Sequence, residues 1–194
     1  MNQKNLFEVD WSKIPAPADD GGAAHLMGMV IPPLSLRATD DTMVTLSALE
    51  GLIILFGYPR TGEPGKIALV DDWDMIPGAR GCTPQTCAFR DLFAELKAAG
   101  AAHVFGLSTQ DNAYQTEMAS RLHLPFPVLS DEKLELTRAL RLPTMEVAGQ
   151  TLIKRLALII EDARITHVFY PVFPPDRNAA EVLDWLKNNS SLVA

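Results

Sequence analysis

The chain has 194 residues, 47% of them hydrophobic, and a formal net charge of −7 from 17 lysines and arginines against 24 aspartates and glutamates. This composition excludes a disordered chain, and the length fits one domain with extensions or at most two small domains. An acidic chain without a cluster of Lys or Arg is not typical of a nucleic-acid-binding protein. No run reaches the ~18 apolar residues that span a membrane, and the first ten residues lack the apolar block of a secretory signal. We therefore expect a cytoplasmic protein that binds neither nucleic acid nor membranes.

Two stretches of the chain have loop composition. Residues 1–30 contain the run Asp-Asp-Gly-Gly and predict an N-terminal arm, which leaves residues 31–194 as the folded domain. Residues 61–81 are rich in Gly, Pro and Asp and predict a long loop inside that domain. Ordered loops of this length are uncommon and are often functional.

Strands and helices alternate along the rest of the chain. The apolar run at 52–58 predicts a strand buried on both faces, and 83–99 predicts a helix capped by Thr83 and stopped by Gly100. Further strands are expected at 103–108, 126–129, 156–160 and 165–170, and further helices at 112–122, 132–140 and 179–188. Strands separated by helices pair in parallel, and the last two strands form an antiparallel hairpin. The order predicts an α/β protein with a thioredoxin-like fold, in which a central mixed sheet is flanked by helices.

The chain has two cysteines, Cys82 and Cys87. Cys82 lies at the start of the predicted helix, where unpaired backbone N–H groups and the helix dipole stabilise a thiolate, the nucleophilic form of cysteine. Arg80 and Arg155 are candidates to add positive charge there. Two cysteines without a histidine at ligand spacing fall short of a zinc site, so we expect no metal and no cofactor. The alternative for either cysteine, and more so for Cys87, is an inert buried side chain.

The spacing of the two cysteines restricts how they can react with each other. Residues five apart on a regular helix have Cα atoms roughly 8.6 Å apart. A disulfide needs Cα atoms about 4.4–6.8 Å apart. A Cys82–Cys87 bond therefore requires the first turn of the helix to unwind, which predicts a site with a helical reduced state and a locally unwound oxidised state.

The segment at 81–91, Gly-Cys-Thr-Pro-Gln-Thr-Cys-Ala-Phe-Arg-Asp, resembles the active-site segment of the Q-type peroxiredoxins, also called bacterioferritin comigratory proteins. Shorter matches follow in the same order as in that family, and together they cover about residues 30 to 188. They are Pro33-Leu34-Ser35-Leu36, Tyr58-Pro59, Gly106-Leu107-Ser108 and the run Phe-Pro-Val-Leu-Ser-Asp at 126–131.

The resemblance implies a thioredoxin-like fold and an atypical two-cysteine peroxiredoxin, a peroxidase for hydrogen peroxide or organic hydroperoxides. Cys82 would be the peroxidatic cysteine, which becomes a sulfenic acid, and Cys87 the resolving cysteine, which closes an intramolecular disulfide. Thioredoxin or a similar dithiol reductant would then reduce that disulfide. Arg155 would hold the thiolate and polarise the peroxide. The resemblance also implies a monomer or a weak dimer.

The sequence departs from the family pattern at one point. Family members usually have Pro seven residues and Thr three residues before the first cysteine, where this chain has Met75 and Ala79. Pro59 and Thr61 are the candidates for displaced equivalents, separated from Cys82 by an insertion. Thr61 reaches the thiolate only if the insertion loops out, and the alternative is that Thr61 is a plain loop residue.

Two other functions compete with the peroxidase hypothesis. One is a redox-responsive binding or regulatory protein, in which oxidation switches the helix end and the inserted loop. The other is a dithiol–disulfide oxidoreductase acting on proteins, which the long cysteine spacing disfavours because closing the pair requires unwinding.

Overall fold

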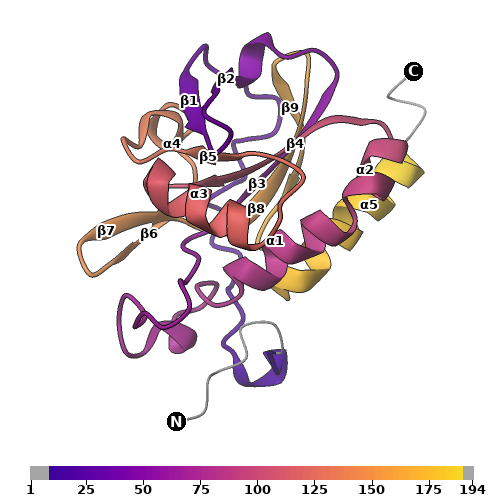
Figure 1. Ribbon diagram of the computed structural model, residues 1–194. Coiled ribbons are helices and arrows are strands. Elements are labelled where there is room, and N and C mark those ends of the chain that lie inside the picture. Colours follow the sequence, from indigo (N-terminus) through magenta and orange to yellow (C-terminus); the bar gives the residue numbers. More distant parts are fainter. Residues whose placement is uncertain (1–8, 190–194) are drawn as a thin grey trace.

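The computed structural model describes residues 9–189, and within them a seven-stranded mixed sheet runs through the molecule (Figure 1). The strand order is β2-β1-β5-β4-β3-β8-β9, with a separate two-stranded hairpin β6-β7. The strands are β1 (Ser35–Ala38), β2 (Met43–Thr45), β3 (Leu52–Gly57), β4 (Ala101–Ser108), β5 (Val128–Ser130), β6 (Thr144–Val147), β7 (Gln150–Ile153), β8 (Leu156–Glu161) and β9 (Arg164–Phe169). As predicted, β3, β4 and β5 pair in parallel, and the β8–β9 hairpin adds antiparallel strands beside β3.

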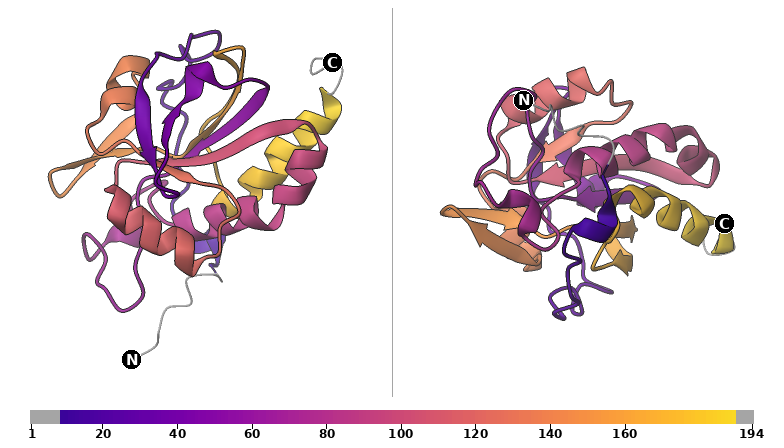
Figure 2. Two further views of the ribbon diagram at one scale, coloured as in Figure 1. Left: turned by 45° about the horizontal axis from the view of Figure 1, so that its top comes forward. Right: turned by 90° about the horizontal axis from the view of Figure 1, so that it is seen from below.

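The helices are α1 (Cys82–Asp91), α2 (Phe93–Ala98), α3 (Asn112–Arg121), α4 (Glu135–Leu140) and α5 (Asn178–Asn188). Helices α1, α2, α3 and α5 cover one face of the sheet (Figures 1 and 2). Their buried side chains form one core cluster with that face. The opposite face is covered by α4 and by apolar residues that precede β1. The prediction of an α/β thioredoxin-like fold with helices on both faces is confirmed.

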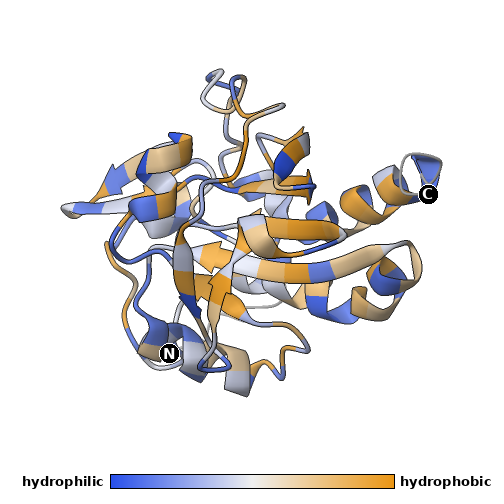
Figure 3. Ribbon diagram, turned by 90° about the horizontal axis from the view of Figure 1, so that it is seen from above, coloured by the Kyte–Doolittle hydropathy of each residue, from blue (hydrophilic) through white to orange (hydrophobic). Residues whose placement is uncertain are grey.

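The central strand β3 explains why the core has two halves. All six of its residues are buried, and alternate side chains point to opposite faces. Ile54 and Phe56 pack under the four helices, while Ile53 and Leu55 pack under α4. Strands buried on both faces are continuously apolar, which is visible as the orange colour of the central strands in Figure 3.

Three local features differ from the sequence predictions. The helix expected at 83–99 is interrupted at Leu92, which separates α1 from α2. Strands β1 and β2 were not predicted, because they have only four and three residues. The β6–β7 hairpin was also missed. Its two-residue turn is Ala148-Gly149, both with positive φ, and its short, half-exposed strands give a weak alternating pattern.

The second half of the predicted N-terminal arm packs on the sheet. Leu26 of the arm, and Ile31 directly after it, are almost fully buried against the face covered by α4. The N–H of Gly28 donates to the carbonyl of Ile165, and Val30 forms a single bridge to Arg164. This part of the arm therefore completes one face of the core, while the domain division at residue 30 stays a prediction.

The predicted loop at 61–81 is an ordered excursion with a small core of its own. It contains a single 3-10 turn, Trp73–Met75. Trp73 and Ala79 pack with Val147 and Leu152 of the β6–β7 hairpin, and we call this group the insertion cluster. The insertion is thus folded onto the β6–β7 hairpin. Across residues 9–189 no helix is long and apolar enough to cross a lipid bilayer.

Candidate active site

Cys82 begins α1, as the sequence predicts, and its side chain is 3% exposed. The residue before it, Gly81, is the N-cap and has φ of +105°, in the left-handed region that glycine tolerates. Gly81 turns the chain sharply out of the insertion and into the helix. The sulfur is therefore held at the helix N-terminus, where backbone N–H groups favour a negative charge.

Two donors from distant parts of the chain point at the sulfur. The backbone N–H of Arg60 donates to Cys82 Sγ at 3.4 Å, and Nη2 of Arg155 approaches the same atom at 3.3 Å. The protonated thiol has an acceptor of its own, the carbonyl of Ala79 at 3.5 Å. Charge-assisted donation to sulfur stabilises the thiolate over the thiol. The site therefore has the donors that a nucleophilic thiolate requires.

Arg155 is 2% exposed and is held by backbone carbonyls as well as by the thiol. Its Nη2 is shared among the sulfur and the carbonyl oxygens of Gly78, Ala79 and Arg80, at 3.2, 3.3 and 3.1 Å. Within residues 9–189, its Nε atom is buried without a hydrogen-bond partner. The last turn of the insertion thus fixes the guanidinium beside Cys82. A buried cation paired with carbonyl dipoles gains further from an anion next to it, which is what the thiolate supplies.

Sequence reasoning missed Gln85 and Asn178, both fully buried. The side-chain oxygen of Gln85 accepts from Nη1 of Arg155, and its amide nitrogen donates to Asn178 Oδ1 at 2.9 Å. This links the first turn of α1 to the start of α5. One feature of the sequence could have pointed to Gln85. It lies three residues after Cys82, so on a helix the two side chains are on the same side.

Pro59 and Thr61 do return to the site, because the insertion loops out between Thr61 and Cys82. Pro59 and Thr61 flank Arg60, whose N–H reaches the sulfur. The carbonyl of Pro59 accepts from Ser108 Oγ at 3.2 Å. Thr61 is 1% exposed, and its hydroxyl donates to Gln110 Oε1 at 3.1 Å instead of to the sulfur. The structure therefore brings the segment 59–61 to Cys82, and catalytic roles for Pro59 and Thr61 remain predictions.

Cys87 has an apolar environment. It is 7% exposed and belongs to the same core cluster as Phe56 and Phe89, whose rings stack with centroids 4.1 Å apart. Burial raises the pKa of the Cys87 thiol, which disfavours its thiolate. Both cysteines are free and lie on one continuous α-helix. A bond between them would require the helix to open, as the spacing predicts.

Residues 9–189 contain no group of three or more His, Cys, Asp or Glu side chains arranged to hold a metal ion. The chemistry around Cys82 is instead that of a thiol with cationic and backbone donors. Tyr58 lies close enough to sense its charge, since burial first and then the negative charge of Cys82 raise the pKa of Tyr58 well above its ordinary value.

Comparison with known proteins identifies the family. The Redoxin family model matches residues 26–183, most of the chain. This chain belongs to the Redoxin family. Peroxiredoxin Q proteins of plant chloroplasts are among its relatives. The chain is 28% identical to one from Triticum aestivum over 162 residues and 28% identical to one from Sedum lineare over 163 residues. These alignments cover 83% of this chain, but 66% of the wheat protein and 77% of the Sedum protein, so the chain spans slightly less than two thirds of the wheat protein's length.

Solved structures agree on the fold. The structure is similar to peroxidoxin BcpB from Mycobacterium tuberculosis, with a TM-score of 0.68 and 24% identity over 84% of this chain and 97% of that one. It is also similar to the bacterioferritin comigratory protein of Xanthomonas campestris, with a TM-score of 0.64 and 20% identity over 91% and 99% of the two chains. The predicted resemblance to Q-type peroxiredoxins is therefore confirmed for this Redoxin chain.

Proposed function

We propose that this Redoxin-family chain is a thiol-dependent peroxidase in which Cys82 is the peroxidatic cysteine. The observation that carries the proposal is the pair of donors on the sulfur, Arg155 Nη2 at 3.3 Å and the Arg60 N–H at 3.4 Å. These donors stabilise the attacking thiolate. They are also placed to interact with the oxygen atoms of a peroxide that approaches the sulfur. The relatives named peroxiredoxin Q support the assignment.

The first step transfers one oxygen atom. The thiolate of Cys82 attacks one peroxide oxygen, the O–O bond breaks, and the sulfur is oxidised to a sulfenic acid. The other oxygen leaves as hydroxide or alkoxide and takes a proton to become water or an alcohol. The Xanthomonas protein that shares this fold is described as active in alkyl peroxide reduction, which supports organic hydroperoxides as one substrate class to test.

The second step joins the two cysteines. Cys87 attacks the sulfur of the sulfenic acid, the S–O bond breaks, and water leaves as the Cys82–Cys87 disulfide forms. The regular helix separates the two Cα atoms by roughly 8.6 Å, so α1 opens at its first turn before the bond forms. A dithiol protein of the thioredoxin kind then reduces the disulfide by exchange, and its own thiols become oxidised.

The test measures peroxide consumption with thioredoxin and its reductase for the wild type, Cys82→Ser and Cys87→Ser. We expect only the wild type to consume more than one hydrogen peroxide or organic hydroperoxide per chain, and peptide mapping of the oxidised wild type to find a Cys82–Cys87 crosslink. Cys87→Ser should still form one sulfenic acid per chain. Wild-type consumption no greater than that of Cys82→Ser would refute the proposal.

One observation favours a second candidate, a redox-responsive binding or regulatory protein. The hydroxyl of Thr61 is engaged with Gln110, and the insertion next to Cys82 is folded onto the β6–β7 hairpin. Opening of α1 would move the end of the insertion and change the surface that it presents. Slow reaction with every peroxide tested, together with a large conformational change on oxidation, would favour this candidate.

A further inference from the structure

The first part of the N-terminal arm lies against the start of the active-site helix. Residues Trp11–Lys13 form a short 3-10 turn capped by Asp10. The ring of Trp11 packs edge-to-face on Phe173 with centroids 6.0 Å apart, and its Nε1–H donates to Asp176 Oδ2 at 2.8 Å. Figure 2 (right) shows this part of the arm, in indigo, beside the segment that leads into α5. The arm is therefore attached through a directed hydrogen bond as well as ring packing.

Trp11 and Pro175 together cover Gly81, the residue before Cys82. A Cβ atom added to Gly81 would lie 2.7 Å from Cη2 of Trp11 and 2.6 Å from Cγ of Pro175. Both side chains are thus in direct contact with the left-handed residue that starts α1. We call Trp11, Pro175 and Asp176, with Gly81 beneath them, the clasp.

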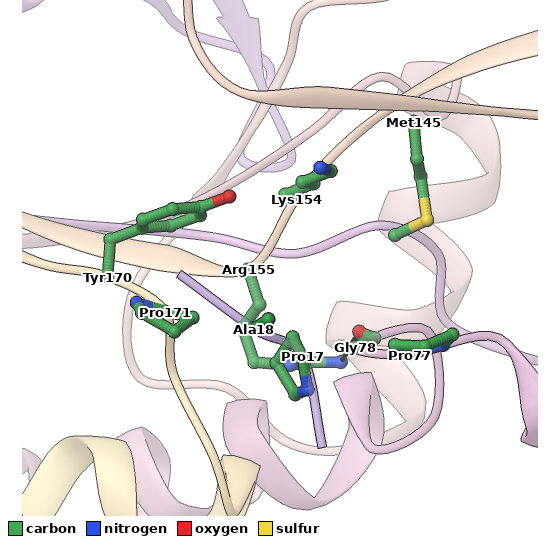
Figure 4. Close-up of a pocket in the computed structure, with 9 residues that line it drawn as sticks. All are labelled: Pro17, Ala18, Pro77, Gly78, Met145, Lys154, Arg155, Tyr170 and Pro171. Atoms are coloured by element: carbon green, nitrogen blue, oxygen red, sulfur yellow. Dashed lines mark hydrogen bonds between the residues drawn. The ribbon is translucent and has the colours of Figure 1, made fainter. Parts of the chain in front are cut away.

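A second attachment holds the arm on the other side of the site. Asp20 accepts from Lys154 Nζ at 2.5 Å and from the hydroxyl of Tyr170 at 2.6 Å, and these two bonds lower the pKa of Asp20. Between the two attachments, Pro17 lies over Gly78, whose carbonyl accepts from Arg155. Figure 4 shows Pro17 and Ala18 beside Arg155 and Gly78, around a cavity of about 100 Å³. The arm therefore runs along the loop 78–81 that positions both Arg155 and Cys82.

Opening of the first turn of α1 must disturb these contacts. The backbone N–H of Gln85 donates to the carbonyl of Gly81 at 3.0 Å, and Thr86 Oγ1 donates to the carbonyl of Cys82 at 2.9 Å. Breaking these bonds frees Gly81 and Cys82 only if Trp11 and Pro175 move as well. Helix ends ordinarily open at small cost, so contacts that bury such an end decide how often it opens.

We propose that Trp11 is a positioning residue for Cys82, which holds Gly81 in place through the clasp and so slows disulfide formation relative to peroxide attack. The inference rests on the proposed function, in which Cys82 and Cys87 react in two successive steps. A slower second step gives the sulfenic acid of Cys82 a longer lifetime. A second peroxide molecule can then oxidise it further to the sulfinic acid.

The kinetic test separates the two steps in the full chain. Reduced protein is mixed with hydrogen peroxide and quenched at intervals, and mass spectrometry counts the thiol, sulfenic acid, sulfinic acid and disulfide forms. In Trp11→Ala we expect disulfide formation to be about tenfold faster, sulfenic acid formation to be no faster, and the sulfinic acid fraction to fall. Asp176→Ala and Trp11→Phe each remove the hydrogen bond and keep an aromatic ring beside Gly81, so their rates of disulfide formation should lie between those of the wild type and Trp11→Ala. Asp40→Ala, in the exposed β1–β2 turn, is the matched control.

Hydrogen exchange tests the clasp without any peroxide. In reduced Trp11→Ala, we expect the amides of Gln85 and Thr86 to exchange about tenfold faster than in the wild type, while Phe89 in the second half of α1 is unchanged. Equal exchange acceleration at all three amides would indicate general destabilisation and would overturn the proposal. The proposal would also be overturned if disulfide formation in both Trp11→Ala and Asp176→Ala stayed within about twofold of the wild-type rate.

The two experiments distinguish failure of the proposed peroxidase function from failure of the clasp proposal. If the wild type forms neither sulfenic acid nor disulfide, the proposed function fails, and hydrogen exchange still decides whether Trp11 holds the first turn. If the wild type forms both and the variants match it, only the clasp proposal fails.

Discussion

The two cysteines of α1 are five residues apart, yet the two halves of the helix surround them with opposite chemistry. The first turn holds Cys82 through polar contacts from Arg60 and Arg155. The second half holds Cys87 in an apolar core beside Phe89. The difference shows that one helix can be stabilised by two independent means. Residues 82–86 are buried and are also tied to distant segments by hydrogen bonds, whereas Cys87 and Phe89 are held by apolar packing.

The largest expected effect comes from a substitution in the apolar second half of α1. Phe89 is fully buried and stacks on Phe56 of the central strand. Phe89→Ala should lower the free energy of unfolding by about 3–5 kcal/mol, because the ring leaves a cavity that the rigid strand cannot fill. Denaturant unfolding followed by circular dichroism measures this. Phe173→Ala, at a half-buried ring, is the matched control and should cost clearly less; equal losses would contradict the comparison.

The second largest effect comes from removing a polar contact to Cys82 in the first turn of α1. Arg155→Met keeps most of the side-chain length and removes the Nη2 donor to Cys82 Sγ, while the Arg60 N–H stays in place. We expect the rate of sulfenic acid formation to fall about 10²–10³-fold, the range for losing an electrostatic donor in an enclosed site.

Stopped-flow measurement of Cys82 oxidation by hydrogen peroxide gives this rate. The control is Arg37→Met on an exposed side chain, which should leave the rate unchanged. A loss of less than about threefold in Arg155→Met would mean that the guanidinium does not act on the reacting atoms.

The pH dependence of alkylation sharpens the comparison. Burial raises the pKa of Cys87, so its reactive thiolate is present only at a higher pH than in the unfolded chain. In folded Cys82→Ser protein we expect the midpoint of Cys87 alkylation by iodoacetamide to lie above the midpoint in 6 M urea. Mass spectrometry at a series of pH values measures both midpoints, and coincident midpoints would contradict the apolar environment of Cys87.

The smallest expected effect concerns Thr61. Its hydroxyl donates to Gln110, which also accepts from the N–H of Thr61. Thr61→Val should cost about 1 kcal/mol of stability, the typical net value of one hydrogen bond. It should slow peroxide attack by no more than about tenfold, while Thr61→Ser should behave like the wild type. A loss as large as that of Arg155→Met would show that Thr61 acts directly on the peroxide.

Most of the sheet was predictable, because its central strands are long and continuously apolar. The existence of β3, β4, β5, β8 and β9 and their pairing directions followed from that pattern and from the intervening helices, whereas their order across the sheet is visible only in the structure. Short elements were missed, since three or four residues carry too little periodicity. The break at Leu92 was missed because its neighbours keep the apolar spacing of a continuous helix across the break.

The site was predictable in part. Cys82 could be named because a cysteine at a helix N-terminus indicates thiolate chemistry, and Arg155 because the resemblance to Q-type peroxiredoxins assigns an arginine to that position. The N–H of Arg60 could not, because every residue has a backbone donor and only the folded chain selects one. Gln110 and Trp11 were missed for a related reason. Their contacts join segments 49 and 165 residues apart, and no local pattern records such a distance.

The contact between Arg60 and Cys82 has a consequence for chain connectivity. The two residues are 22 apart in sequence, and the exposed stretch at 64–68 between them does not touch the sulfur. Since β3 pairs with β4 and β8, a polypeptide of residues 1–65 would be held to one of residues 66–194 through the middle of the sheet. We therefore expect two such fragments to associate when mixed, so that separate polypeptides supply the two sides of the Cys82 thiol, and gel filtration of the mixture would measure this association.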